Sequence, residues 1–150
     1  MKNGWQSYLK KECLISDDRD HSIKTVFEQI VKFLLTCQNT SNLKIIHPPK
    51  VVSVEDNFDL LLFPKGAKVR SDFHTIYVNE SHVLISQMST AVATWIRDNY
   101  HGGDCFILCP GLVYRKTGIH YQLDIWELNT SGTQSSNNNA TSKALAIINH

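Results

Sequence analysis

The sequence lacks the patterns that mark membrane-spanning and secreted proteins. Its 150 residues contain no apolar run near the roughly 18 residues that a membrane-spanning helix needs. Residues 1–11 are polar, so we expect no secretory signal peptide. The formal net charge is only +1, which is too small a basic excess to indicate nucleic-acid binding by itself. We expect a cytoplasmic or organellar-matrix protein that is not secreted and that binds neither membranes nor DNA.

Cysteine and histidine are present, but not in the spacing of a metal site. The four cysteines are Cys13, Cys37, Cys105 and Cys109, and they form no C-x-x-C pair. The last two would suit a metal only on a helix, whereas the apolar residues between them are typical of a strand. The seven histidines include no H-x-x-x-H pair. The sequence therefore predicts buried, reduced thiols, no metal site and a reducing compartment.

Hydrophobic periodicity divides the chain into three parts. We expect an N-terminal extension at 1–20, a folded core at 21–128 and a polar tail at 129–150. The tail is rich in Asn, Ser and Thr, and such a segment buries too little apolar surface to offset its ordering entropy. At 150 residues the chain has about the length of one domain.

The core contains the patterns of two helices and several strands. Helices are predicted at 22–37 and 89–99 from apolar residues at the helical period. Strands are predicted at 44–49 with a continuation at 51–54, at 75–78, at 83–85, at 104–114 with an interruption at Pro110-Gly111, and at 121–128 after a loop at 115–120. This order indicates an α+β fold, in which helices pack on one face of an antiparallel sheet.

Alternation along the last strand predicts two different faces. Leu123 and Ile125 point to one side, and Gln122, Asp124 and Trp126 point to the other. The first face would pack on helices. The second is either the floor of a cleft or a face in contact with solvent.

A series of motifs from His21 to about Leu128 resembles the catalytic core of a class II aminoacyl-tRNA synthetase, in particular the phenylalanyl-tRNA synthetase alpha chain. The series, rather than any single motif, carries the resemblance. It begins with a helix from His21 and a strand that ends at Pro48-Pro49, which are like the first class II signature. The Asn-Phe-Asp stretch within 54–64 follows, and then Arg70, Tyr77 and the segment 83–91. It ends with Cys-Pro-Gly-Leu-Val-Tyr-Arg at 109–115, which is like the start of the second signature.

This resemblance implies an enzyme that joins phenylalanine to ATP, with Mg²⁺, and then passes the acyl group to tRNA. Arg115 would stabilise the charge on the phosphate, because a guanidinium is permanently charged and fork-shaped. Gln122 and Asp124 would hold the α-amino group, with Ser89 and Gln87 beside the amino acid. The alternatives are a surface arginine at a strand end for Arg115, solvated strand residues for Gln122 and Asp124, and a helix N-cap for Ser89.

The sequence also departs from the family pattern. Ile85 stands where the family usually has an arginine, Gln87 where it has a histidine, and His74 where it has an aspartate. The loop after Arg115 is short and lacks the acidic residue that normally follows. After Glu127 the chain has a single glycine and no arginine, so the third signature, which clamps the nucleotide, is missing. The resemblance thus covers about the first half of a truncated catalytic module.

Three interpretations remain open. The chain is a synthetase-type module that is incomplete on its own, or a non-catalytic synthetase paralogue that binds tRNA, an amino acid or a protein partner, or a small domain with an accidental likeness. Class II cores generally dimerise through the first signature. Val26, Ile30 and Phe33 could therefore form a homodimer surface, unless their helix only covers its own sheet. A second synthetase subunit is the other possible partner.

Overall fold

The main sheet has three strands, with the longest apolar strand in the centre. The computed structural model describes residues 5–11, 13, 21–36 and 42–129. The strand order is β1 (Leu43–Ile45), β4 (Cys105–Arg115), β5 (Gly118–Leu128). β4 and β5 pair antiparallel, whereas β1 pairs parallel with β4. The α+β class is confirmed, but the sheet is mixed. The long crossover at 46–104 lets β1 and β4 run in the same direction.

Two expected strands have other structures. β2 (Val51–Ser53) does not extend β1; it pairs antiparallel with β3 (His82–Leu84) in a separate two-stranded sheet. Two prolines lie between β1 and β2, and proline donates no ladder hydrogen bond. The strand predicted at 75–78 is wrong as well. Thr75 and Tyr77 form only isolated bridges, with Arg115 and Val83 respectively.

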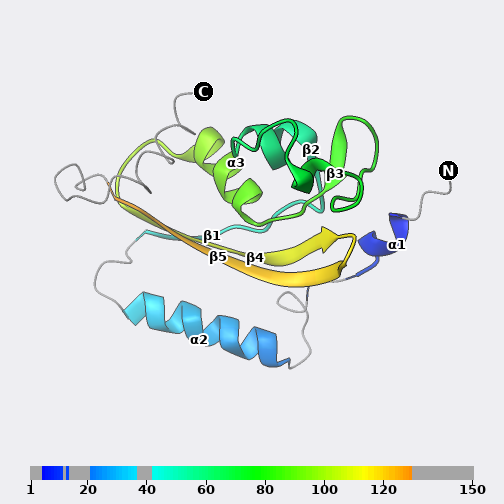
Figure 1. Ribbon diagram of the computed structural model, residues 1–150. Helices are drawn as coiled ribbons and strands as arrows, with labels where there is room; N and C mark the ends of the chain where they lie inside the picture. The colour runs from blue at the N-terminus through cyan, green and yellow to red at the C-terminus, as the bar shows by residue number, and fades with distance from the viewer. Residues whose placement is uncertain (1–4, 12, 14–20, 37–41, 130–150) are drawn as a thin grey trace.

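Helices cover both faces of the main sheet rather than one. α3 lies on one side together with β2 and β3, and α2 lies on the other (Figure 1). The bounds are α1 Gln6–Leu9, α2 Ser22–Thr36, α3 Ser89–Asn99, the π-helix η1 Glu55–Asp59 and the 3₁₀ helix η2 Lys68–Arg70. The two long helices match their predicted ranges closely, because each has a continuous apolar stripe. None of the helices in the described part is long and apolar enough to cross a membrane.

β4 runs without interruption through Pro110 and Gly111, where a break was predicted. The carbonyl of Leu108 accepts a hydrogen bond from Ile46 N–H at 2.9 Å, so the even-numbered backbone groups of β4 face the side of β1. β1 ends opposite Leu108. The backbone of Pro110, another even-numbered residue of β4, also faces the side of β1. Pro110 lies beyond the last residue of β1, however, so its missing N–H costs no hydrogen bond to β1.

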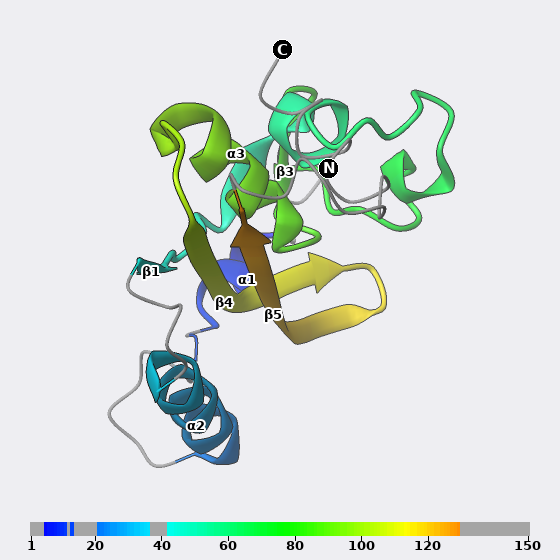
Figure 2. The ribbon, with the colours of Figure 1, turned by 90° about the vertical axis from the view of Figure 1, so that its left-hand side faces the viewer.

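The β4–β5 hairpin is tighter than predicted, and Figure 2 shows its extended shape. Arg115 pairs with Gly118, which leaves only Lys116 and Thr117 in the turn. Gly118 has φ 136°, a conformation that residues with a side chain rarely adopt. The turn therefore fixes Arg115 at the last paired position of β4.

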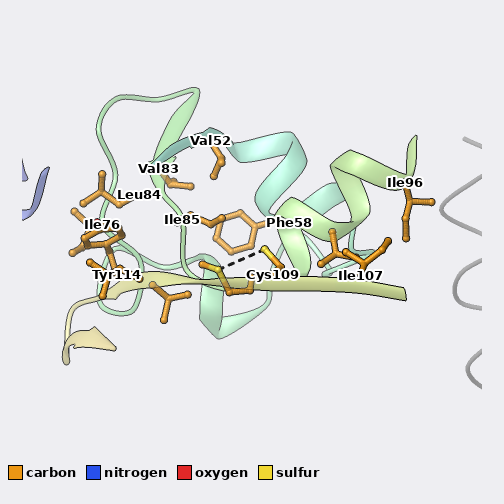
Figure 3. Packing of buried hydrophobic residues seen from close by; sticks show 14 of the residues in the cluster. Val52, Phe58, Ile76, Val83, Leu84, Ile85, Ile96, Ile107, Cys109 and Tyr114 are labelled. Atoms are coloured by element: carbon orange, nitrogen blue, oxygen red, sulfur yellow. Dashed lines mark hydrogen bonds between the residues drawn. The ribbon is translucent and has the colours of Figure 1, made fainter. Parts of the chain in front are cut away.

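The core lies between β4 and the layer of α3 and η1 (Figure 3). Phe58, Ile85 and Met88 are completely buried in it. Gly111 is needed at this interface, because a Cβ there would lie 2.8 Å from Met88 Sδ. Cys109 Sγ also contacts Met88 Sδ, at 3.9 Å.

Cys105 and Cys109 are free thiols. Cys105 and Cys109 are buried, as predicted, while Cys13 is half-buried and Cys37 lies outside the described residues. Burial, and to a smaller extent the negative charge of Asp124, raises the pKa of the Cys109 thiol to about 12. Cys109 is therefore an unreactive packing residue.

The opposite face of the sheet is less completely covered. No residue of α2 is buried. Val26 is 54% exposed and Phe33 is 66% exposed. A hollow of about 280 Å³ lies between α2 and β5, lined by Ile30 and Leu123 among others. α2 therefore covers its sheet only in part.

Candidate functional site

Arg115 extends from the end of β4 on an exposed side chain. Its Nε donates a hydrogen bond to the carbonyl oxygen of Ser86 at 3.2 Å. The backbone of Arg115 also bridges to Thr75. The guanidinium is thus held at one nitrogen, and its two NH₂ groups have no hydrogen-bond or ion-pair partner among the described residues.

Gln122 and Asp124 form a pair on β5. Gln122 Nε2 donates to Asp124 Oδ1 at 2.8 Å, and both side chains are half-buried. They lie opposite Gly111 and Cys109 of β4. Directly opposed residues of an antiparallel pair share a face, so both side chains lie on the α3 side of the sheet. The predicted alternation of this strand is confirmed.

The register relates Arg115 to this pair. Arg115 follows Gly111 by four residues on β4, so it lies on the same face as Gln122. Four residues of strand span about 13 Å. The three side chains therefore line one surface, with the arginine at its end and the amide and carboxylate further along it.

The segment between β3 and α3 carries Gln87 and Ser89. Gln87 Nε2 donates to the backbone carbonyl of Asn57 at 2.9 Å. Ser89 is the first residue of α3 and is half-buried. The position before the helix belongs to Met88, which makes no side-chain cap hydrogen bond. The alternative in which Ser89 is the N-cap of α3 is therefore wrong.

Asn57 organises this segment, and the sequence did not single out that role. It is completely buried, and its Nδ2 donates to Ser86 Oγ at 2.9 Å. Its Oδ1 accepts hydrogen bonds from Thr90 Oγ1 at 3.2 Å and from Ser86 N–H at 3.3 Å. Together with the Gln87 bond to its carbonyl, Asn57 fixes the segment from which both Gln87 and the carbonyl partner of Arg115 extend.

Arg70 and Tyr77 support the fold near the site. Arg70 pairs with Asp59 and with the Phe63 carbonyl, and its side chain is only 9% exposed. Its guanidinium lies 5.0 Å from the centre of the Phe58 ring, a cation–π contact. Tyr77 Oη donates to the Arg70 carbonyl at 2.6 Å. These contacts hold the segment from η1 to η2 in place.

Electrostatics near η1 follow from these pairs. Hydrogen bonds from Lys65 and then Arg70 hold the pKa of Asp59 below its usual value. Within the described residues, no group of three or more His, Cys, Asp or Glu side chains could hold a metal ion.

Known proteins resemble this chain over part of its length. No protein-family model matches it. The phenylalanine–tRNA ligase alpha subunit of Fusobacterium nucleatum is 38% identical over 71 residues, which cover 47% of this chain and 20% of that protein. That of Ureaplasma urealyticum is 28% identical over 102 residues, 68% of this chain and 29% of that protein. That of Bacillus cytotoxicus is 35% identical over 60 residues, 40% and 17% respectively.

This chain contains a region related to phenylalanine–tRNA ligase alpha subunits. It spans less than a third of the length of these relatives. The resemblance predicted from the motifs is supported at this level. The roles predicted for Arg115, Gln122, Asp124, Ser89 and Gln87 stay predictions. The structure pairs Gln122 with Asp124, places Arg115 on the same face, and ties Gln87 to Asn57.

Proposed function

We propose that this chain is a phenylalanine–tRNA ligase-type module of class II, which binds phenylalanine and the α-phosphate of ATP and is incomplete on its own. The observation that carries the proposal is the Gln122–Asp124 pair on the same sheet face as Arg115, in a chain that contains a region related to phenylalanine–tRNA ligase alpha subunits. An amino-acid-activating site needs acceptors for an ammonium group and a fixed cation for a phosphate. This surface supplies both kinds of group.

The paired side chains suit the amino group of an amino acid. An ammonium group donates three hydrogen bonds and needs acceptors. Gln122 donates its amide N–H to Asp124, which leaves the amide oxygen as an acceptor next to the carboxylate. The pair therefore presents two kinds of oxygen at one point of the surface. Ser89 and Gln87, at the start of α3, complete the amino-acid side of the site.

Arg115 suits the phosphate. Its Nε–H is directed to the Ser86 carbonyl, so the two NH₂ groups are oriented outward as a fork. In the activation step the carboxylate of phenylalanine attacks the α-phosphorus of ATP, and pyrophosphate leaves. Negative charge grows on the phosphoryl oxygens, and a positioned guanidinium stabilises it.

The rest of the catalytic module must come from elsewhere. The residues after Glu127 contain no arginine that could act as the nucleotide clamp of the third signature. We assign this clamp to a second synthetase subunit or to a continuation of the polypeptide. ATP with Mg²⁺, phenylalanine and tRNA are then the ligands, and the compartment is the cytoplasm or an organellar matrix.

ATP–pyrophosphate exchange with phenylalanine tests the proposal. The purified chain is assayed alone and with its synthetase partner subunit. We expect Arg115→Ala to lower the exchange rate by about 10²–10³-fold, the usual effect of losing one preorganised charge-stabilising donor. Asp124→Asn should raise the KM for phenylalanine. Lys32→Ala, on α2 across the sheet, is the matched control and should change neither value.

Two results would contradict the proposal. One is no exchange above background in either preparation. The other is full exchange in the Arg115→Ala variant, which would mean that this arginine is an ordinary surface residue.

A non-catalytic paralogue is the second candidate, and Ile85 favours it. Its side chain is completely buried in the core, at the position where the family usually has an arginine.

Thermal unfolding with ATP, phenylalanine or a non-hydrolysable phenylalanyl-adenylate mimic separates the enzyme module from the non-catalytic paralogue. A ligand at 100 times its dissociation constant adds about 2.7 kcal/mol of stability. A shift with the mimic supports the enzyme module. No shift with any of the three supports the paralogue.

A further inference from the structure

Exposed apolar side chains gather on the side of the main sheet where α2 lies (Figure 1). Five of the eight large apolar side chains that are exposed in the described residues belong to α2 or to the outer strands β1 and β5: Val26, Phe33, Leu35, Ile45 and Ile125. Ile45 and Ile125 flank the buried Leu108 in one row across the three strands. α2 therefore leaves apolar surface uncovered at both edges of this face.

The hollow between α2 and β5 is the concave part of this face. Its volume is about 280 Å³. All of its lining residues except Ser22 and Gln122 are apolar or aromatic, and they include Ile30 and Leu123. Ile125, two residues after Leu123, extends the same face toward the end of β5. An aliphatic occupant would remove this surface from water, whereas a charged ligand finds no ionic partner in the lining.

The sequence after β5 contains one apolar segment, which lies outside the described residues. Residues 129–142 are polar apart from Gly132 and Ala140, whereas residues 143–148 are Lys-Ala-Leu-Ala-Ile-Ile. We call residues 144–148 the aliphatic segment. Its side chains are of the same kind as those that line the hollow. Burial of such side chains against an apolar surface is the dominant favourable term in most protein association.

The hollow lies within reach of the aliphatic segment of the same chain. β5 ends at Leu128, and Leu123 in the lining lies five residues before this end, which is about 17 Å along a strand. The intervening residues 129–142 number fourteen, and a chain of this length spans at most about 46–50 Å. The segment therefore reaches the hollow at well below full extension. Because it is tethered, its effective concentration at the hollow is independent of the protein concentration, which favours it over a second copy.

We propose that the aliphatic segment folds back into the hollow between α2 and β5, with its side chains against Ile30 and Leu123. The segment would then cover the face of β5 opposite to the one that carries Gln122 and Asp124, and would hold this edge strand to α2. The proposal uses only the apolar surface and the length of the chain, so it does not rest on the proposed function. Phe33 lines no part of the hollow and stays outside this contact.

Photo-crosslinking in the full chain tests the proposal. A p-benzoylphenylalanine residue takes the place of Asn149, directly after the aliphatic segment, and mass spectrometry identifies the residues that it joins on irradiation. We expect crosslinks to residues 22–30 and 121–125 of the same chain, with a yield that stays constant over a roughly 100-fold dilution. The same photoreactive residue in place of Asn138, within the polar stretch, is the matched control and should not crosslink to these residues.

Hydrogen exchange gives a second measurement. Leu145→Asp places a charge on the aliphatic segment, and an unpaired charge is not tolerated in an apolar hollow. We expect the backbone amides at 22–30 and 119–125 to lose protection in this variant. Asn138→Asp makes the same change of charge in the polar stretch and should leave their protection unchanged. The amides of β4, at the centre of the sheet, report that the fold is retained.

The outcomes separate the possible occupants of the hollow. Crosslinks within one chain, together with loss of protection in the Leu145→Asp variant, support the proposal. Crosslinks between two chains, with a yield that falls on dilution, would assign the hollow to a second copy and overturn it. Crosslinks elsewhere, or wild-type protection in the Leu145→Asp variant, would overturn it too. Neither measurement involves ATP or phenylalanine, so this proposal and the proposed function fail separately.

Discussion

Asn57 illustrates how one buried amide can control several functional positions. It is flanked in sequence by acidic residues and by Phe58, yet its side chain is completely buried. A buried amide is tolerated only when its hydrogen bonds are satisfied, and here Ser86 and Thr90 supply the partners. Since the Ser86 carbonyl also accepts a hydrogen bond from Arg115, Asn57 acts on this guanidinium, the proposed phosphate-binding group, through one intermediate residue.

Replacing Asn57 should therefore affect both stability and the candidate site. We expect Asn57→Ala to lower the free energy of unfolding by about 1–3 kcal/mol, since it leaves buried donors and acceptors unsatisfied. Urea unfolding measures this. Hydrogen exchange of the amides at 85–89 should accelerate locally as well. Asn99→Ala, at the exposed end of α3, is the control and should stay within about 0.5 kcal/mol. Equal losses in the two variants would contradict the central role of Asn57.

At the scale of elements, ion pairs add to the core packing of Phe58 in holding the segment from η1 to η2. Asp59 at the end of η1 pairs with Lys65 and with Arg70 at the end of η2. Arg70 is nearly buried, so its positive charge needs this partner. The same segment lines a hollow of about 540 Å³ beside η2. The shape of the hollow should therefore depend on the ionisation of Asp59.

This dependence predicts an acid-sensitive contribution to stability. The pKa of Asp59 is lowered in the folded protein, so its stabilising effect is present above the unfolded value of about 3.9 and is lost as pH falls through the lower folded value. Asp59→Asn should be less stable than wild type at pH 6, and the difference should shrink toward pH 2. Urea unfolding across this range measures it. The exposed Asp72→Asn is the control. A difference that stays constant with pH would contradict the prediction.

Sequence reasoning succeeded at this scale where local pattern decides the structure. The periodicity of α3 predicted Ser89–Asn99, and the alternation of β5 placed Gln122 and Asp124 on one face. Sequence reasoning failed where a residue's structure depends on a partner that is distant in the sequence. Pro110 is tolerated in β4 only because β1 ends early, and the role of Asn57 depends on contacts with residues about thirty positions later. No local signal contains that information.

At the scale of the whole molecule, two surfaces of the described residues are incompletely covered. β5 is an edge strand of eleven residues in the described sheet, and α2 presents apolar side chains to solvent. Long open edges and exposed apolar patches are typical of surfaces that another chain or segment covers. Both surfaces fit the proposed module, which would be completed by another chain or segment.

The apolar face of α2 gives the sharpest test of assembly. Val26 and Phe33 are more than half exposed and Ile30 is half-buried, and Val26 and Ile30 line the same hollow against β5, so the sheet covers this apolar stripe only in part. We expect sedimentation equilibrium at high micromolar concentration to show a dimer. A symmetric interface carries each substitution twice, so Phe33→Glu should restore the monomer at the same concentration. Lys32→Glu, one position away and exposed, should leave the dimer intact. A wild-type monomer at high micromolar concentration would contradict a homodimer.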